Sequence, residues 1–319
     1  MKKISFFRFV LAFIFLGAIG FLENRSLLAY EEVDVQNGGK ITGKVTLKGT
    51  IPEPRVFSLV LYPFGAFCKR ISNGDGNVLV EEFYVGSGGG LTDVVVAVQG
   101  VKKGKSFPRI NPKWVAEDCM FHPADVSFSE KNLLDQDGRT HHEHPLVTVV
   151  ENHQPIAVEN LDPVVHNTQV YQNQKGNIIL NVPLPPPPAP GAKNGGGMIH
   201  FEEGKRIFQM ICGAHEFMQS WGFMVDNPYY IKTKKEGDFT IDRLPPGTYK
   251  VTAWHPHMDL IEKEVTVDAN GTVNLDFEFD AKQVERPIYE SQKQFRIRPE
   301  ALPHEHLLHN SPFRQRPPG

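Results

Sequence analysis

Residues 212–218 read Cys-Gly-Ala-His-Glu-Phe-Met and place a thiol, an imidazole and a thioether in one short stretch. A second imidazole lies upstream, where residues 162–167 read Asp-Pro-Val-Val-His-Asn. Two His and one Cys in a trigonal plane, with a weak axial Met, are the ligands of a blue-copper electron-transfer site. Structural zinc normally takes four strong ligands and leaves the thioether out. The donor set therefore favours copper, bound by His166, Cys212, His215 and Met218.

The spacing of these donors matters as much as their identity. A cysteine at the end of a strand, followed within a few residues by His and Met, brings three ligands to one ion in a single tight loop. The fourth ligand, His166, then comes from a distant strand. A single Cys is more often a small buried hydrophobe than a ligand, so the metal hypothesis depends on the four residues taken together.

The pattern Cys-x2-His-x2-Met with an upstream His-Asn resembles the cupredoxins, the family of plastocyanin, pseudoazurin and amicyanin, over roughly residues 115–226. The short gap between His215 and Met218 is similar to that of amicyanin. The resemblance implies a Greek-key β-sandwich with one type 1 copper ion, used for outer-sphere electron transfer and not for catalysis. It also implies that Asn167 ties the two ligand-bearing segments together and that His215 reaches the surface as the electron port. Apolar cover for the ion is expected from Phe217, Trp221 and Phe223.

The N-terminus predicts export. Lys2, Lys3 and Arg8 precede an unbroken apolar run over residues 9–22, which is the layout of a secretory signal peptide. We expect a signal peptide at 1–29 and a periplasmic or secreted protein. The alternative is an uncleaved anchor, which would be the protein's one membrane contact. The net charge of −3 indicates no nucleic-acid partner.

Export changes the interpretation of the three cysteines, because an oxidising compartment favours disulfides and three is an odd number. If Cys212 binds copper, Cys68 and Cys119 remain as a pair, and we expect a disulfide between them. The alternative is that both are free and buried.

Short β-branched and alternating runs, separated by Gly, Pro, Asn and Asp, predict an all-β chain. A second resemblance lies at residues 236–249, where a Gly-Asp turn, a strand and a Pro-Pro-Gly turn look like a carboxypeptidase regulatory-like domain, a small Ig/transthyretin-like β-sandwich. Its earlier strands resemble residues 41–47 and 91–98. We therefore expect a discontinuous sandwich from residues 38–108 and 227–280, with a cupredoxin-like domain at 109–226 inserted into it and a basic Pro-rich tail at 281–319. Three small β modules in tandem are the alternative.

Four further segments have less specific patterns. Residues 184–197 are rich in Pro and then Gly, which favours an exposed loop or a docking surface. His141, His142 and His144 form one His-rich tract, and His304, His306 and His309 form another; each is either a second metal site or a solvated segment. Residues 254–258, Trp-His-Pro-His-Met, are interpreted as structural, with Trp254 in a core and metal binding as the alternative.

The sequence thus predicts an exported type 1 copper protein that passes electrons to or from a redox protein, such as a c-type cytochrome or a dehydrogenase. Two alternatives belong to other classes. One is a copper storage or delivery protein, and the other is an exported adhesion or glycan-binding module without metal. An enzyme is not expected, because one complete four-ligand site is visible and no catalytic triad or paired-carboxylate site stands out.

Overall fold

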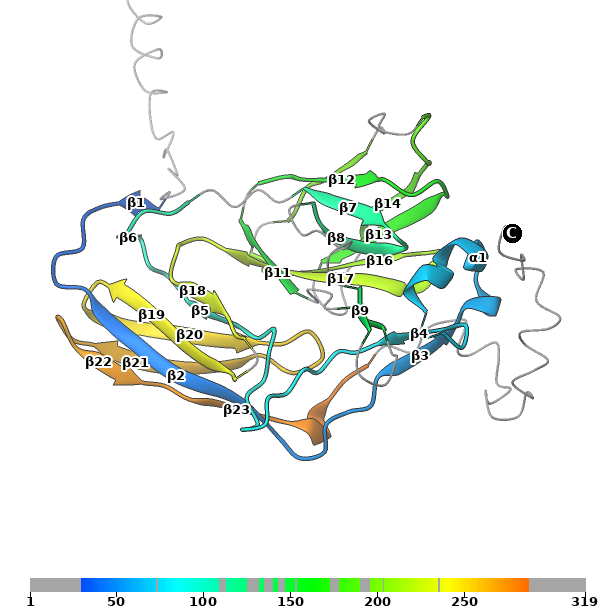
Figure 1. Ribbon diagram of the computed structural model, residues 1–319. Coiled ribbons are helices and arrows are strands. Elements are labelled where there is room, and N and C mark those ends of the chain that lie inside the picture. Colours follow the sequence, from blue (N-terminus) through cyan, green and yellow to red (C-terminus); the bar gives the residue numbers. More distant parts are fainter. Residues whose placement is uncertain are drawn as a thin grey trace, which may run out of the picture.

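The computed structural model describes residues 30–286 except 73, 109–112, 125–131, 135–139, 143–146, 153, 173–177, 190–195, 203 and 235. Within this part of the chain, strands dominate and the helices are short, so the predicted all-β class is confirmed (Figure 1). The strands form two sandwiches. The signal segment, His144, the tail beyond residue 286 and its three histidines lie outside the described residues.

The first sandwich contains the predicted ligands. One of its sheets has the strand order β11-β17-β16-β13-β14, and the other has the order β15-β12-β7-β8. The bounds of the first sheet are Val147–Glu151 (β11), His215–Val225 (β17), Ile207–Cys212 (β16), His166–Gln172 (β13) and Ile178–Leu184 (β14). Those of the second are Gly197–Ile199 (β15), Ile156–Asn160 (β12), Trp114–Glu117 (β7) and Met120–Pro123 (β8).

Strand β13 illustrates how the sequence forms this sandwich. Successive side chains of a strand point to opposite faces, and in β13 every second residue from His166 to Gln172 is buried. Val170 occupies one of these inward positions and packs in the first core with Phe208 and Trp114. The alternation therefore places His166, the first residue of β13, on the core face.

The second sandwich is built from two separate parts of the chain. Its sheets have the orders β18-β5-β20-β21 and β19-β2-β22, and β23 also pairs with β2. Their bounds are Gly39–Lys48 (β2), Val95–Val98 (β5), Tyr230–Lys232 (β18), Asp238–Leu244 (β19), Gly247–Trp254 (β20), Ile261–Val267 (β21), Thr272–Asn274 (β22) and Phe277–Asp280 (β23). The ladder Thr42 to Thr240 joins the segments 38–108 and 227–280 in one sheet.

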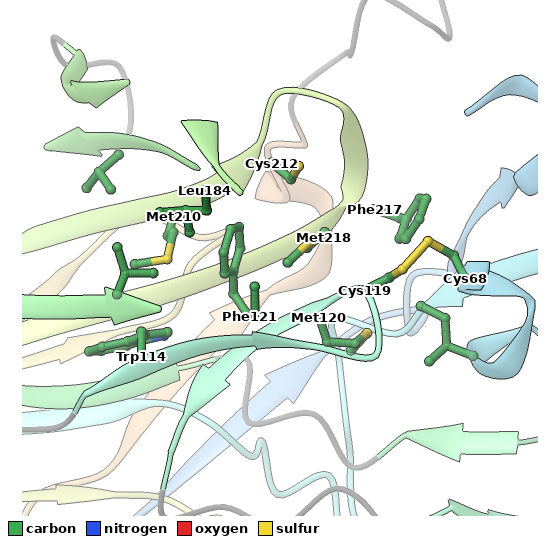
Figure 2. Close-up of a cluster of buried hydrophobic side chains, with 14 of the residues drawn as sticks. Cys68, Trp114, Cys119, Met120, Phe121, Leu184, Met210, Cys212, Phe217 and Met218 are labelled. Atoms are coloured by element: carbon green, nitrogen blue, oxygen red, sulfur yellow. A yellow bond between two sulfur atoms is a disulfide. The ribbon is translucent and has the colours of Figure 1, made fainter. Parts of the chain in front are cut away.

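A cap segment, defined here as residues 59–71, leaves the second sandwich and packs on the first. It contains η1 (Leu59–Leu61), α1 (Gly65–Cys68) and η2 (Lys69–Ile71), and it follows β3 (Arg55–Ser58), which pairs with β4 (Asn77–Val80). Leu59, Cys68 and Ile71 are buried in the core of the first sandwich. The predicted disulfide Cys68–Cys119 is present, with 5.6 Å between the α-carbons, and it joins α1 to the turn between β7 and β8 (Figure 2).

The two sandwiches share an apolar layer between β17 of the first and β20 and β5 of the second. The ring of Trp254 lies 5.5 Å from that of Phe223 and 6.3 Å from that of Trp221, measured between centroids. Trp254 is fully buried, as the sequence predicts. Because the contact is apolar and aromatic, we expect the sandwiches to behave as one packed body.

Four short strands and one helical turn complete the described elements. These are β1 (Glu31–Glu32), β6 (Lys103–Gly104), β9 (Asn132–Leu134), β10 (Thr140–His142) and η3 (Ala281–Gln283). His141 and His142 lie in β10, and their side chains are outside the description. Among the described residues there is no helix with the length and apolar character needed to cross a membrane.

Candidate metal centre

Three of the four predicted ligands meet at one end of the first sandwich. His166 begins β13, Cys212 ends β16 and His215 begins β17, and these three strands are neighbours in one sheet. The two Nδ1 atoms of the histidines lie 3.3 Å apart. The Sγ atom of Cys212 lies 3.8 Å from Nδ1 of His166 and 3.5 Å from Nδ1 of His215. All three side chains are fully buried.

These distances match the spacing of ligands around one metal ion. Bonds of about 2.3 Å to sulfur and about 2.0 Å to nitrogen, separated by angles of about 109° to 120°, put the nitrogens about 3.3–3.5 Å apart and sulfur about 3.5–3.7 Å from each nitrogen. The observed triangle agrees with these values to about 0.1 Å. The donors are therefore assembled in the arrangement that a trigonal or tetrahedral ion requires.

The orientation of both imidazoles is set by what their other nitrogens contact. Nε2 of His166 donates to a carboxylate oxygen of Asp162 at 2.8 Å, and Nε2 of His215 donates to the main-chain oxygen of Pro63 at 2.8 Å. The hydrogen bond made by one ring nitrogen decides which nitrogen is left to bind a metal. Nδ1 is therefore the nitrogen that each ring directs at Cys212, and it is the nitrogen left to bind a metal.

The electrostatics of the cluster favour a thiolate. Burial by itself raises the pKa of Cys212, but hydrogen bonds from His166 and His215 outweigh burial and lower this pKa to about 6. Burial opposes a charge on His166, yet the neighbouring Asp162 and Cys212 raise the pKa of His166 to about 9. The thiolate is the form of cysteine that binds metals, whereas a metal ion at His166 would have to displace the proton that the raised pKa keeps on this ring at neutral pH.

The hairpin between β16 and β17 explains why Cys212 and His215 lie together. The two residues pair across a turn made of Gly213 and Ala214. The main chain of Asn167 is hydrogen-bonded to this turn on both sides. Its N–H donates to Sγ of Cys212 at 3.3 Å, and its carbonyl accepts the N–H of Gly213 at 2.8 Å. Asn167 thus links the two ligand-bearing segments, as the resemblance implies, although it does so through its backbone.

Met218, the fourth predicted ligand, is fully buried in β17 and belongs to the same core as Cys212 (Figure 2). Residues three apart on a regular strand face opposite sides. The pairing of β16 with β17, however, jumps from Ile211–Gln219 to Cys212–His215, so residues 216–218 interrupt the regular ladder. Because of this irregularity, the side chains of Met218 and His215 do not have to face opposite sides of the sheet.

The environment of His215 differs from the expectation of a surface electron port. His215 is 0% exposed, because the cap segment covers it. Besides the Pro63 contact, the ring of Phe64 lies 6.3 Å from its ring, and Sγ of Cys68 lies 4.0 Å from its Nε2. Phe64 is itself 39% exposed. The cap lies about 150 residues upstream of the motif, and no local pattern in the sequence indicates that it covers the site.

The expected apolar cover is also only partly correct. The ring of Phe217 lies 5.5 Å from that of His215 and lines the site. Trp221 and Phe223 lie further along β17 and pack in the layer between the two sandwiches. They lie there because β17 runs from the end of the first sandwich where His166, Cys212 and His215 meet to the layer shared with the second sandwich.

Asp162 is a site residue that the sequence interpretation did not assign. It is 2% exposed and contacts His166 directly. A carboxylate four residues before His166, the first predicted ligand, is the signal that could have identified it. A second group of potential ligands, Cys119 with Asp162 and His166, shares this residue. The sulfur of Cys119 is bonded to Cys68, so that group does not form a second site.

The segment 254–258 has a structural role. Nε2 of His255 donates to the main-chain oxygen of Glu82 at 3.1 Å, and Nδ1 of His255 accepts the N–H of His257 at 3.3 Å. Both nitrogens of His255 are therefore engaged. Burial and the neighbouring His257 lower the pKa of His255 to about 3, so it is neutral. The metal alternative for this segment receives no support.

Comparisons with known proteins give two partial matches. Residues 225–280 match the carboxypeptidase regulatory-like domain family. A purple cupredoxin from Nitrosopumilus maritimus is 21% identical over 25% of this chain and 79% of its own, with a TM-score of 0.20. An amicyanin variant in its reduced Cu(I) form is 16% identical over 25% of this chain and 70% of its own, with a TM-score of 0.19. A Cu-containing nitrite reductase from Thermus scotoductus is 11% identical over 38% of this chain and 24% of its own, with a TM-score of 0.23.

No curated protein matches the chain. The carboxypeptidase regulatory-like and cupredoxin resemblances inferred from the sequence motifs both recur among these matches. Each match covers a small part of this chain or has a low sequence identity. The case for a metal therefore rests on the geometry of the side chains.

Proposed function

We propose that this protein is an exported type 1 copper protein that transfers electrons without binding a substrate at the metal. The observation that carries the proposal is the preassembled triangle of one thiolate and two Nδ1 atoms, with separations of 3.3, 3.5 and 3.8 Å. Copper at this place would supply a one-electron couple. Met218 is proposed as the weak axial ligand.

In this proposal the protein scaffold keeps the three donor atoms in fixed positions. His166, Cys212 and His215 each start or end a strand of one sheet, and each is hydrogen-bonded or packed on the side away from the others. The geometry of a rigid ligand set that excludes water changes little between oxidation states. This small change favours outer-sphere electron transfer. The apolar surroundings and the sulfur of Met218 would tune the reduction potential of a bound copper ion.

The proposed electron route does not pass directly from an exposed histidine to the partner. Nε2 of His215 is bonded to the carbonyl of Pro63, and the next residue, Phe64, reaches the surface. Electrons would therefore leave through the cap segment to a redox protein, such as a c-type cytochrome or a dehydrogenase. The disulfide Cys68–Cys119 supports a periplasmic or secreted location, because such bonds persist in oxidising compartments.

Reconstitution of the metal-free protein with Cu(II) tests the proposal. We expect an intense blue absorption from the thiolate–copper bond, which Cys212→Ser abolishes. Thr168→Val is a matched control, since Thr168 is buried opposite Cys212 in β13 but supplies no ligand. A wild-type protein without this band would contradict the proposal.

Storage or delivery of copper is a second candidate, favoured by the complete burial of His215 beneath the cap. A carrier would lose its ion to a competing chelator and would not cycle reversibly at an electrode. An electron-transfer protein retains its ion and gives a reversible one-electron wave, so voltammetry separates the two. If the protein were instead an adhesion or glycan-binding module, the purified protein would contain no metal.

A further inference from the structure

Asp162 connects a proposed metal ligand to the turn that bears the disulfide. One of its carboxylate oxygens accepts Nε2–H of His166 at 2.8 Å. The same carboxylate accepts the backbone N–H of Asp118 at 2.6 Å and that of Cys119 at 2.8 Å. Three donors therefore converge on one carboxylate that is 2% exposed.

We infer that Asp162 is a positioning residue of the metal centre, which orients Nδ1 of His166 toward the ion and strengthens it as a donor. This inference rests on the proposed function, since it concerns the same site. The inference further implies that the two proposed histidine ligands differ in strength as metal donors.

The difference between the histidines lies in their acceptors. His166 donates to an anionic carboxylate, whereas His215 donates to the neutral carbonyl of Pro63. A buried negative charge behind an imidazole increases its basicity toward a metal, and such outer partners typically contribute 10–100-fold in metal affinity. The added charge stabilises Cu(II) more than Cu(I), so Asp162 lowers the reduction potential.

The surrounding backbone holds this carboxylate in place. Asp118 and Cys119 have φ values of 51° and 56°, and this left-handed turn between β7 and β8 directs both N–H groups to Asp162. From the other side, the N–H of Asp162 donates to the side chain of Asn160 at 2.9 Å. The Asn160 amide in turn donates to the carbonyls of Val164 and Leu184. Asp162 is thus fixed from both sides, which a positioning residue requires.

The test compares Asp162→Asn with Glu159→Gln in the full-length, disulfide-bonded protein. Both variants remove one carboxylate from the same segment of the chain, but only Asp162 contacts His166, whereas Glu159 pairs with Lys113. The probe is Zn(II), added to the metal-free protein in competition with a chromophoric chelator.

We expect Asp162→Asn to lose about 10–100-fold in Zn(II) affinity, and Glu159→Gln to bind like the wild type. With copper, the reduction potential of Asp162→Asn rises by about 59 mV for each tenfold preferential loss of Cu(II). Equal Zn(II) affinities of the two variants would overturn the inference. This outcome is separate from failure of the proposed function, which appears as a missing blue band in the wild type.

A measurement on the wild type keeps the inference testable if Asp162→Asn does not fold. Nitrogen-15 NMR of the Zn(II)-loaded protein reports the tautomer of each histidine. We expect His166 to carry its proton on Nε2, with slow exchange of that proton because Asp162 holds it away from solvent. A His166 protonated on Nδ1, or with a rapidly exchanging Nε2 proton, would contradict the role of Asp162.

Discussion

Nε2 of His215 donates a hydrogen bond to the main-chain oxygen of Pro63 at 2.8 Å, although 152 residues separate the two in the sequence. This contact closes the end of the first sandwich where His166, Cys212 and His215 meet, and His215 is 0% exposed beneath the cap segment. It also makes the cap segment part of the site. The properties of the site should therefore depend on how firmly the cap is held.

The disulfide should stabilise both the fold and the cap. Its two cysteines are 51 residues apart, and closure of such a loop contributes about 4 kcal/mol in the chain-entropy model. We expect the double variant Cys68→Ala with Cys119→Ala to lose stability of this order in denaturant unfolding. Because the cap is released, a chelator should remove the bound metal faster. Unchanged metal release would show that the cap stays in place without the bridge.

Phe64 should control access to His215. Its φ of 56° lies in the left-handed region, so Phe64→Gly removes the ring without adding backbone strain. We expect the reduced copper protein to be oxidised faster by a small anionic oxidant, measured by stopped flow. Leu61→Ala is the control, since Leu61 is also exposed on the cap, at 37%. Equal acceleration in both variants would indicate general loosening of the cap.

Met218 should tune the potential without deciding whether the metal binds. Met218→Leu conserves volume and is therefore expected to cost less than about 1.5 kcal/mol in stability. Loss of an axial sulfur disfavours Cu(II), so we expect the blue band to persist and the reduction potential to rise. Met210→Leu makes the same exchange at another fully buried position of the core. A potential that is equal in the two variants would exclude Met218 as a ligand.

His255 should make the second sandwich sensitive to acid. Its pKa is about 3 in the folded protein, against 6.5 for an ordinary histidine. Between these values the unfolded chain binds the extra proton, so stability is complete above about pH 6.5 and falls as the pH drops toward 3, by up to about 1.4 kcal/mol per pH unit.

Denaturant unfolding of the metal-free protein between pH 4 and pH 7 measures this slope. In His255→Gln the contribution of this histidine disappears, and the curve should be flatter although the protein is less stable overall. His200→Gln is a suitable control, because His200 is exposed. A slope in His255→Gln equal to that of the wild type would show that another group is responsible.

The features that could be predicted from the sequence are local or follow a short period. Alternating residues in β13 place His166 on the core face, and a two-residue turn brings Cys212 beside His215. The odd number of cysteines suggested the bridge between Cys68 and Cys119. The first two features follow from the spacing of residues along a strand and around a hairpin, whereas the bridge follows from the cysteine count of a chain expected to be exported.

The features decided by the tertiary structure involve segments that are far apart in the chain. The cap over His215 and the interface that takes Trp221 away from the site depend on how the two sandwiches pack. The carboxylate of Asp162 lies close to His166 in sequence, but the backbone turn at Cys119 that fixes it is 43 residues away. The sequence by itself therefore determined the all-β class, and it predicted four donors of which the structure brings His166, Cys212 and His215 together. Tertiary packing decided which nitrogen each histidine presents and how the site is shielded, because both depend on hydrogen bonds that form only after distant segments have met.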